Sequence, residues 1–446
     1  MNDDDNKLRK IVREEIEKYF KEGFKVGEHS IYLRPSYIDM NSNEFRNVAG
    51  GSSSTTYYIS KSGSTYYAKN SATGAVTSNS VFTTLFNNIV GSMTTGGVLT
   101  IKDGTFVITS PGLSMNNNVS VFCTKGTILQ LGYNGIAINF YNTHDARLSD
   151  ANIYGLKGSY SSGRGIYFSG NSYRNKVSNN YINSFGTKGI HIYGSGCTYN
   201  IISDNTVYDV NEEGIMIAYS NHNTVKNNKV EITGNHGIVS TGGSYNIIDA
   251  NDVSAAGQNH VSGWAHGIAV DGNGGSNPCF GDKITNNIVN GTYHAGIEVA
   301  DQANKCVISK NLVENSGTFG GNMYGIYFGG GMDESYECAI SDNVIRDSAA
   351  EGIYIGGSSG NLTNKVTMTN NVVTGCSLDG IKIEYCDNIN VQNNVVQLNG
   401  GYGFRITQST GVDYVIVTGN NFLNNTLGST FVTGSNSNGL VDNNLV

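Results

Sequence analysis

The sequence predicts an all-β solenoid, in which the chain winds through stacked coils of short strands. Two motifs repeat through most of the 446 residues: a Gly-Ile pair and, a few tens of residues later, an Asn followed by an apolar residue. Copies of the first motif begin 23 to 30 residues apart, at positions 165, 189, 214, 237, 267, 296, 325, 352, 380 and 403. A period in this range indicates one coil per repeat, each stable only when it stacks on its neighbours.

The composition of the chain favours strands, and its net charge limits the classes of molecule that it is expected to bind. The chain has 58 Gly, 3 Pro and 14% charged residues, which is typical of strands and turns rather than helices. A net charge of -8 argues against nucleic acid or an anionic membrane as the main partner. No apolar run approaches the ~18 residues of a membrane span. The acidic start, residues 1–5, is unlike a signal peptide, so we expect export by another route or as part of a particle.

Three segments follow one another along the chain. Residues 1–56 begin with apolar positions at helical spacing up to about residue 24. A lone helix of that length is marginal in water, so we expect it to serve attachment or oligomerisation. Residues 57–134 form the solenoid entry, with an amphipathic helix over 81–90 that caps the core. Full coils occupy residues 135–446.

Alternation within each coil predicts which side chains face the core. In Gly-Ile-x-Ile both aliphatic residues point inward and x faces solvent. A column of asparagines is expected to hydrogen-bond from coil to coil: Asn180, Asn205, Asn228, Asn251, Asn287, Asn311, Asn343, Asn371, Asn394, Asn421 and Asn444. A second column lies five residues earlier, at Asn175, Asn200, Asn223 and Asn246. We expect both columns to be structural. The seven cysteines lack metal-ligand spacing and are expected to be buried and reduced.

This pattern resembles the right-handed, single-stranded parallel β-helices of the pectin-lyase-like class, with about 11 coils over residues 57–446. The class includes lyases, hydrolases, epimerases and inert spikes, so the resemblance implies a fold rather than one activity. Residues 38–49, IDMNSNEFRNVA, are similar to a motif near the start of many phage tail-fibre and tailspike proteins. That similarity implies a homotrimer attached through its N-terminus to a virion baseplate or tail, at the extracellular surface.

Candidate binding residues gather on the outer face of the Gly-Ile strands. The x positions read Tyr167, His191, Met216, Val239, Ala269, Glu298, Tyr327, Tyr354, Lys382 and Arg405. The positions before each glycine read Arg164, Lys188, Glu213, His236, His266, Ala295, Tyr324, Glu351, Asp379 and Tyr402. Between positions 237 and 380, rungs about 4.8 Å apart would suit an extended glycan. We predict contacts with substrate from Trp264, His266, His294, Tyr324, Tyr327, Glu351 and Tyr354. Trp264 could instead plug its own loop.

Three carboxylates are candidates for hydrolysis of a glycosidic bond. Asp271 and Glu298 are expected on adjacent rungs, two residues apart along the strand, so they would be about 8 Å from one another. That separation leaves room for water in an inverting glycosidase. Glu298 would act as the acid, with Asp271 or Asp301 as the base. These carboxylates could equally be ordinary solvated groups on a solenoid face.

Elimination on a uronic acid is the second chemistry considered. It needs a base, a proton donor and a cation that neutralises the carboxylate. Tyr327 or Tyr354 with His266 or His294 could supply the first two, and Lys382 or Arg405 the cation. Those cations lie two or more rungs from the histidines, about 10 Å or more away, so hydrolysis is favoured. No metal or cofactor is expected.

We therefore predict a tailspike-type protein that recognises a cell-surface polysaccharide and cleaves it. One alternative is a non-catalytic glycan-binding adhesin that uses the same face. Another is a structural fibre that assembles end to end, because the sequence stops in mid-coil at residues 443–446 and leaves a strand edge.

Overall fold

The computed structural model describes residues 24–26, 29–31, 55–258, 265–272, 277–317, 323–329, 335–357, 362–407, 412–433, 440–442 and 444–445. The predicted N-terminal helix, the tail-fibre-like motif and Trp264 lie outside these residues. The chain divides into two compact units, residues 1–53 and 54–446. In the first unit, the short strands β1 (Phe24–Val26) and β2 (His29–Ile31) pair antiparallel.

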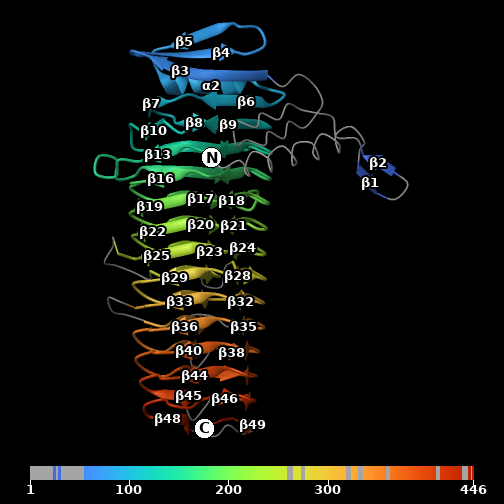
Figure 1. Ribbon diagram of the computed structural model, residues 1–446, viewed down its shortest axis with the longest axis vertical. Coiled ribbons are helices and arrows are strands. Elements are labelled where there is room, and N and C mark those ends of the chain that lie inside the picture. Colours follow the sequence, from blue (N-terminus) through green and yellow to red (C-terminus); the bar gives the residue numbers. More distant parts are fainter. Residues whose placement is uncertain are drawn as a thin grey trace, which may run out of the picture. The chain divides into compact units, whose positions relative to one another are not determined.

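The second unit is a stack of coils, each of which contributes one strand to each of three long sheets (Figure 1). The strands that follow the Gly-Ile motif form the Gly-Ile sheet of 13 strands. All are parallel to their neighbours. In chain order they are β8 (Leu113–Ser114), β11 (Ile136–Tyr141), β14 (Arg164–Ser169), β17 (Ile190–Tyr193), β20 (Ile215–Ala218), β23 (Ile238–Thr241), β26 (Ile268–Asp271), β30 (Ile297–Ala300), β34 (Ile326–Gly329), β37 (Ile353–Gly356), β41 (Ile381–Glu384), β45 (Tyr402–Thr407) and β48 (Gly428–Thr433).

The strands that follow each ladder asparagine form a second parallel sheet, the Asn-ladder sheet, of 12 strands. They are β7 (Gly104–Ile108), β10 (Thr127–Leu131), β13 (Asn152–Tyr154), β16 (Tyr181–Asn183), β19 (Thr206–Val210), β22 (Lys229–Thr233), β25 (Asp252–Ala256), β29 (Ile288–Asn290), β33 (Leu312–Glu314), β36 (Val344–Arg346), β40 (Val372–Thr374) and β44 (Val395–Gln397). The two sheets give about twelve coils, close to the predicted number.

A third sheet closes each coil, and its first three strands form an antiparallel entry. In order of pairing it contains β5 (Val76–Asn79), β4 (Thr65–Asn70), β3 (Thr55–Ser62), β6 (Gly97–Ile101), β9 (Val119–Cys123), β12 (Arg147–Ser149), β15 (Lys176–Ser178), β18 (Ile201–Ser203), β21 (Thr224–Lys226), β24 (Ile247–Asp249), β28 (Lys283–Thr285), β32 (Val307–Ser309), β35 (Ala339–Ser341), β39 (Thr367–Thr369), β43 (Asn390–Gln392), β47 (Ile416–Thr418) and β49 (Leu440–Asp442). Shorter pairings join β27 (Cys279–Phe280) to β31 (Ala303–Asn304), and β42 (Cys386–Asp387) to β38 (Thr363–Asn364) and β46 (Val412–Asp413).

The predicted capping helix is present as α2 (Phe82–Ser92), between the entry strands and the first coils (Figure 1). Its buried face carries Phe82, Leu85 and Phe86. The Phe82 ring lies 4.8 Å from that of Phe106 on β7, centroid to centroid. The helix therefore covers apolar surface that the first coil would otherwise expose. Within the described residues, no helix is both long and apolar enough to span a membrane.

The Gly-Ile motif packs the interior as predicted. The inward aliphatic residues are fully buried, as at Ile215 and Ile217 of β20. Each motif glycine approaches the next coil too closely for a side chain. A Cβ at Gly237 would lie 2.3 Å from Val253 Cγ1 and 2.7 Å from the carbonyl oxygen of Gly267.

The asparagine column is a continuous hydrogen-bonded ladder. Asn205 Nδ2 donates to Asn228 Oδ1 at 3.0 Å, and the backbone N–H of Asn205 donates to the same oxygen at 3.0 Å. The residue before each ladder asparagine takes the left-handed turn conformation, for example Asn227 with φ 54. One member was predicted wrongly: the ladder runs through Asn420, not Asn421, because Asn420 accepts the bonds from Asn394.

The second asparagine column is also confirmed and continues in a different residue type. Below Asn246 the position is taken by Asp282, which accepts a 2.8 Å hydrogen bond from the Asn246 backbone N–H. Cys306 and Cys338 occupy the same position on the next two coils, and Cys338 Sγ accepts a 3.1 Å hydrogen bond from the Cys306 backbone N–H. All seven cysteines are free and buried, as predicted.

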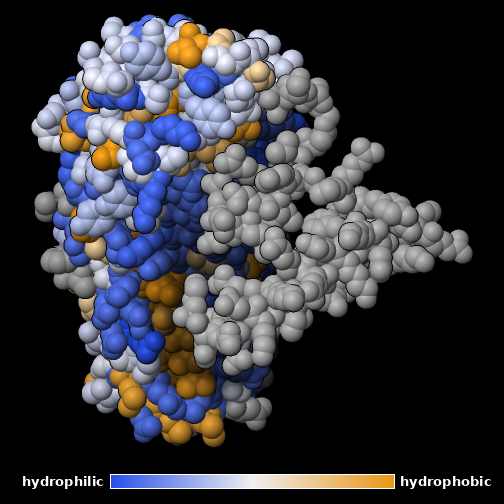
Figure 2. Space-filling view, turned by 45° about the horizontal axis from the view of Figure 1, so that its top comes forward, coloured by the Kyte–Doolittle hydropathy of each residue, from blue (hydrophilic) through white to orange (hydrophobic). Residues whose placement is uncertain are grey.

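Apolar side chains also lie on the outside of the described coils. On the outer face of the Asn-ladder sheet one apolar column runs through five successive strands, at Ile288, Leu312, Val344, Val372 and Val395. In the face shown in Figure 2, a band of hydrophobic surface runs over the lower coils, below a largely hydrophilic region.

Candidate functional site

Side chains of the Gly-Ile sheet line up along its outer face in the predicted register. From β26 downward, Ala269, Glu298, Tyr327, Tyr354 and Lys382 follow one another on adjacent strands. The prediction that these x residues face solvent is wrong for the middle coils, where His191, Val239, Ala269 and Glu298 are buried. Alternation gives the direction of each side chain, but neighbouring coils and flanking side chains decide whether water reaches it.

Glu298 on β30 is the most perturbed carboxyl group of this face. It is 8% exposed. Burial, together with the charges of Asp271 and Asp301, raises its pKa to about 8. A carboxyl group with such a pKa is protonated at neutral pH and can donate a proton.

The three predicted catalytic carboxylates are brought to one place. Asp271 ends β26 and pairs with Ala300, two residues beyond Glu298 on the adjacent strand. Asp301 follows directly and turns the chain with φ 50. Both aspartates are half-buried and both interact electrostatically with Glu298. Glu298, which is buried and protonated at neutral pH, thus lies beside two carboxyl groups that are more exposed to solvent.

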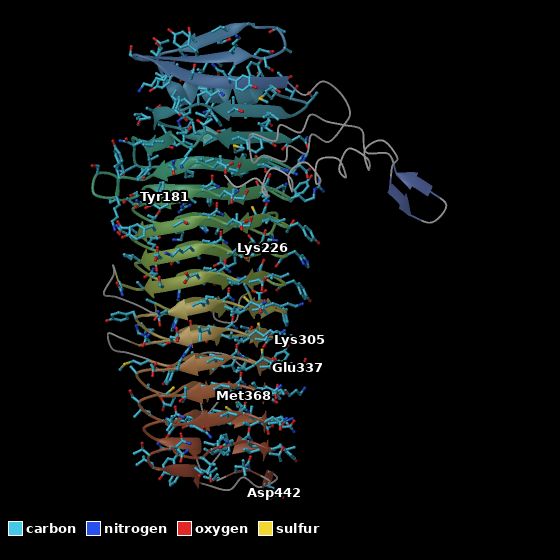
Figure 3. All side chains as sticks on the ribbon, in the orientation of Figure 1. Tyr181, Lys226, Lys305, Glu337, Met368 and Asp442 are labelled. Atoms are coloured by element: carbon cyan, nitrogen blue, oxygen red, sulfur yellow. The ribbon has the colours of Figure 1, made fainter. Side chains whose placement is uncertain are left out.

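Glu337, at a turn of the same solenoid, is a carboxylate whose pKa is lowered rather than raised. Glu337, labelled with Lys305 at one edge of the coils in Figure 3, is solvent-exposed. Its Oε1 lies 3.2 Å from Lys365 Nζ and its Oε2 lies 3.6 Å from Lys305 Nζ. The hydrogen bond from Lys365 lowers the pKa of Glu337. Glu298 and Glu337 therefore differ in burial and in the sign of the charges around them.

Three histidines, of which His266 is fully buried, form a cluster next to Glu298. His266 Nε2 lies 3.1 Å from Glu298 Oε2, and His266 is fully buried. The His266 ring stacks on His236 with centroids 5.4 Å apart, and its centroid lies 5.7 Å from that of His294. Burial lowers the pKa of His236 to about 4 and that of His266 well below its usual value. His266 is thus placed to orient Glu298 rather than to touch a ligand.

Three of the predicted binding residues form one aromatic cluster below Glu298. The rings of Tyr324, Tyr327 and Tyr354 are nearly parallel, with centroids 4.6 to 5.7 Å apart. Burial raises the pKa of Tyr324 to about 12 and raises those of Tyr327 and Tyr354 as well. A tyrosine base needs the opposite shift, so this cluster is unsuited to the elimination chemistry considered from the sequence.

The lower end of the face is a network of paired charges. Lys382 Nζ lies 3.5 Å from Glu351 Oε1 and 2.9 Å from Glu384 Oε1. Tyr354 donates a 2.7 Å hydrogen bond to Glu384 Oε2. Burial opposes ionisation of Glu384, yet hydrogen bonds from Thr407, Tyr354 and Lys382 together lower its pKa. Because two carboxylates already compensate Lys382, it is poorly placed to neutralise a uronate.

Sequence reasoning missed Glu384 as a member of this network. Its position two residues after Lys382 on the same strand would have placed it on the outer face. Within the described ranges, no group of three or more His, Cys, Asp or Glu side chains is arranged to hold a metal ion.

Comparisons with known proteins agree with the repeat pattern. Residues 164–333 match the family described as right handed beta helix region, and residues 256–446 match the periplasmic copper-binding protein (NosD) family. Each match covers less than half of the chain. Among curated proteins, no relative matches the sequence.

Solved structures with a similar course of the chain include proteins of several kinds. The surface adhesin PfbA of Streptococcus pneumoniae is 13% identical over 80% of this chain and 88% of its own, with a TM-score of 0.53. Tailspike protein 3 of bacteriophage CBA120 is 11% identical over 84% of this chain and 59% of its own, with a TM-score of 0.49. The A-module of an Azotobacter vinelandii mannuronan C-5 epimerase is 12% identical over 81% and 94%, with a TM-score of 0.47.

At these identities the likeness concerns the fold alone. The three stacked parallel sheets, the matching repeat family and the adhesin structure lead to one conclusion, which confirms the predicted fold. The chain is a right-handed parallel β-helix protein.

Proposed function

We propose that the outer face of the Gly-Ile sheet binds an extended polysaccharide and that the coil carrying Glu298 hydrolyses it. The observation that carries this proposal is the buried Glu298 carboxyl group, whose pKa is raised to about 8 beside Asp271 and Asp301. A protonated acid next to a second carboxyl group is the pairing that glycoside hydrolysis requires.

The chemistry assigns one role to each carboxyl group. Glu298 donates its proton to the glycosidic oxygen as the bond from the anomeric carbon to that oxygen breaks. Ionised Asp271 or Asp301 takes a proton from the water whose oxygen bonds to the anomeric carbon. The register offsets Asp271 from Glu298 by one strand and two residues, or about 8 Å, which favours inversion. His266 keeps the Glu298 carboxyl group in one orientation.

The biological setting we propose is that of a tailspike. A virion-attached homotrimer would bind a bacterial cell-surface polysaccharide, with tyrosines 324, 327 and 354 in contact with the sugar chain. Support for this setting comes from the tail-fibre-like sequence at residues 38–49. The polysaccharide is the partner expected of a long, rigid face with regularly spaced side chains.

A non-catalytic adhesin is the second candidate. The observation that favours it is the 8% exposure of Glu298, which leaves little of the acid open to a substrate. In that case the same face would bind glycan without cleaving it.

The test is incubation of the full chain with acidic and neutral bacterial polysaccharides. Chain length is followed by size-exclusion chromatography, and unsaturated uronates by ultraviolet absorbance. We expect shorter chains without new absorbance, and a rate lowered about 10²- to 10⁴-fold in Glu298→Gln. The matched control Glu337→Gln should keep the wild-type rate. New absorbance, or an unchanged rate in Glu298→Gln, would overturn the mechanism, and binding without cleavage would establish the adhesin.

A further inference from the structure

Unpaired polar atoms gather on the outer face of the Gly-Ile sheet well above Glu298. Asn139 on β11, Arg164 on β14 and His191 on β17 lie on three successive strands. Asn139 Oδ1, Arg164 Nε and both ring nitrogens of His191 are buried and have no hydrogen-bond partner in the described part of the protein. His191 is only 7% exposed. Buried polar atoms are nearly always paired, so several unpaired atoms in one place mark a position where water or a polar ligand would complete the hydrogen bonds.

Arg164 is the uncompensated cation of this cluster. Its neighbour Lys188 forms ion pairs with Glu212 and, at 2.9 Å, with Glu213. Among the described residues, no carboxylate lies within ion-pair distance of Arg164, whose guanidinium carbon is 4.7 Å from the centroid of the Tyr167 ring. Burial, Arg164 and Lys188 lower the pKa of His191 to about 3. The neutral imidazole therefore offers one N–H donor and one acceptor.

Exposed aromatic side chains border the same cluster. Tyr193 is 44% exposed, and its ring lies 5.6 Å from that of His191, centroid to centroid, with the two planes at 63°. Tyr141, at the end of β11, is 62% exposed. A half-buried cation, neutral hydrogen-bonding groups and an aromatic rim together suit a sugar that carries one negative charge.

We infer that Asn139, Arg164 and His191 form a subsite for a monoanionic sugar residue, with Arg164 facing its carboxylate or sulfate. This inference rests on the proposed function, because the sugar belongs to the polysaccharide bound along the same face. Four strand spacings separate His191 from Glu298 through Met216, Val239 and Ala269. That distance is about 19 Å, or about four sugar units.

The test uses the acidic polysaccharide that binds most tightly in the panel described above, cut to oligosaccharides of about eight units. Affinities are measured by calorimetry for the native oligosaccharide and for the same one after carboxyl reduction or desulfation. The protein carries Glu298→Gln so that the ligand is not consumed. We expect removal of the charged groups to weaken binding about tenfold or more, as for loss of a charge-assisted contact. The modification that weakens binding identifies the anion.

The decisive variant is Arg164→Gln. It should weaken binding of the native oligosaccharide by the same factor and leave binding of the uncharged one unchanged. The control Arg147→Gln removes an exposed charge from the third sheet and should alter neither. The His191 ring, followed by NMR, should show a raised pKa when the acidic ligand binds, which an Arg164 needed only for folding would not produce.

Three results would overturn the inference, and they are distinguishable from failure of the proposed function. They are equal losses in Arg164→Gln for both ligands, no loss for either, or preferential binding and cleavage of a neutral polysaccharide. In the last case the proposed function survives without the subsite. Absence of binding to every polysaccharide would remove the proposed function and the subsite together.

Discussion

Glu298 and Glu337 show how the same side chain acquires opposite properties in one solenoid. The first lies among His266, Asp271 and Asp301, and the second lies in water beside two lysines. The difference arises from burial and from the sign of the neighbouring charges, because both groups sit on a regular coil. The pKa of a glutamate in this solenoid thus depends on its position rather than on its residue type.

The raised pKa of Glu298 predicts the alkaline limit of activity. The proton needed by the leaving group is present below pH about 8 and is lost as pH rises through that value. We expect the rate of hydrolysis to fall tenfold per pH unit above this limit, measured as reducing ends released across pH 5 to 10. A rate that keeps rising beyond pH 9 would contradict the role of Glu298 as the acid.

Asp282 predicts a separate dependence of stability on pH. It is buried, accepts a 2.6 Å hydrogen bond from Ser240, and burial raises its pKa from 3.8 to about 7. A raised folded-state pKa means that the stabilisation present below pH about 4 is lost as pH rises through 7. The shift corresponds to about 4 kcal/mol at most.

Asp282→Asn would restore the residue type of the column above it. We expect it to raise the free energy of unfolding at pH 9 by a few kcal/mol while changing little at pH 4, measured by denaturant unfolding. Equal pH slopes in wild type and variant would show that Asp282 stays ionised in the folded protein.

Some of these residue roles can be predicted from the sequence. Asp282 lies five residues before Asn287, as Asn246 lies five before Asn251, so spacing alone places it in the buried column. The contact of His266 with Glu298 is different. Strand register brings the two onto neighbouring coils, but their burial and mutual approach depend on rotamers that periodicity does not encode.

At the scale of the element, the glycine of each Gly-Ile motif controls how closely coils approach. Gly237→Ala forces a Cβ within 2.3 Å of Val253 and 2.7 Å of a backbone oxygen. We expect a loss of about 1 to 3 kcal/mol in the free energy of unfolding. Gly158 has nothing within 4 Å of its added Cβ, so Gly158→Ala should stay within about 0.5 kcal/mol of wild type. Similar losses at both positions would mean that the close approach to the next coil does not set the effect.

The strands and the ladder were predictable because both follow a short local rule. Gly-Ile-x-Ile predicts β17 and β20 by alternation, and Asn205 and Asn228 mark the start of the next strands. The rule failed at Asn421, where two adjacent asparagines satisfy the motif and only pairing distinguishes them. Asn420 enters the ladder because it sits two residues after β47, as Asn394 sits two after β43.

At the scale of the whole molecule, strand pairing in the described coils joins each coil only to its neighbours. Residues 229–251 form one complete coil, which carries β22, β23 and β24. Deleting them should leave a folded protein with cooperative thermal unfolding, because Asn228 would then precede Asp252 as Asn251 does now. Circular dichroism and size-exclusion chromatography would show this.

Deletion of half a coil, residues 229–240, provides the control. It shifts every later inward residue out of register with the coil above, so we expect aggregation or loss of the β-sheet spectrum. If the complete-coil deletion behaves as badly as the half-coil deletion, the solenoid is less modular than its pairing suggests.

The constant strand spacing bears on the length of the oligosaccharide that this protein would release. Because His191 and Glu298 are fixed to different rungs of one rigid stack, their separation changes only in whole steps of about 4.8 Å. Loss of the coil 229–251 would bring the proposed subsite at His191 one step nearer to Glu298, about one sugar unit. The number of coils between the proposed subsite and Glu298 would then set the length of the oligosaccharide that is released. That length would change by about one sugar unit for each coil gained or lost.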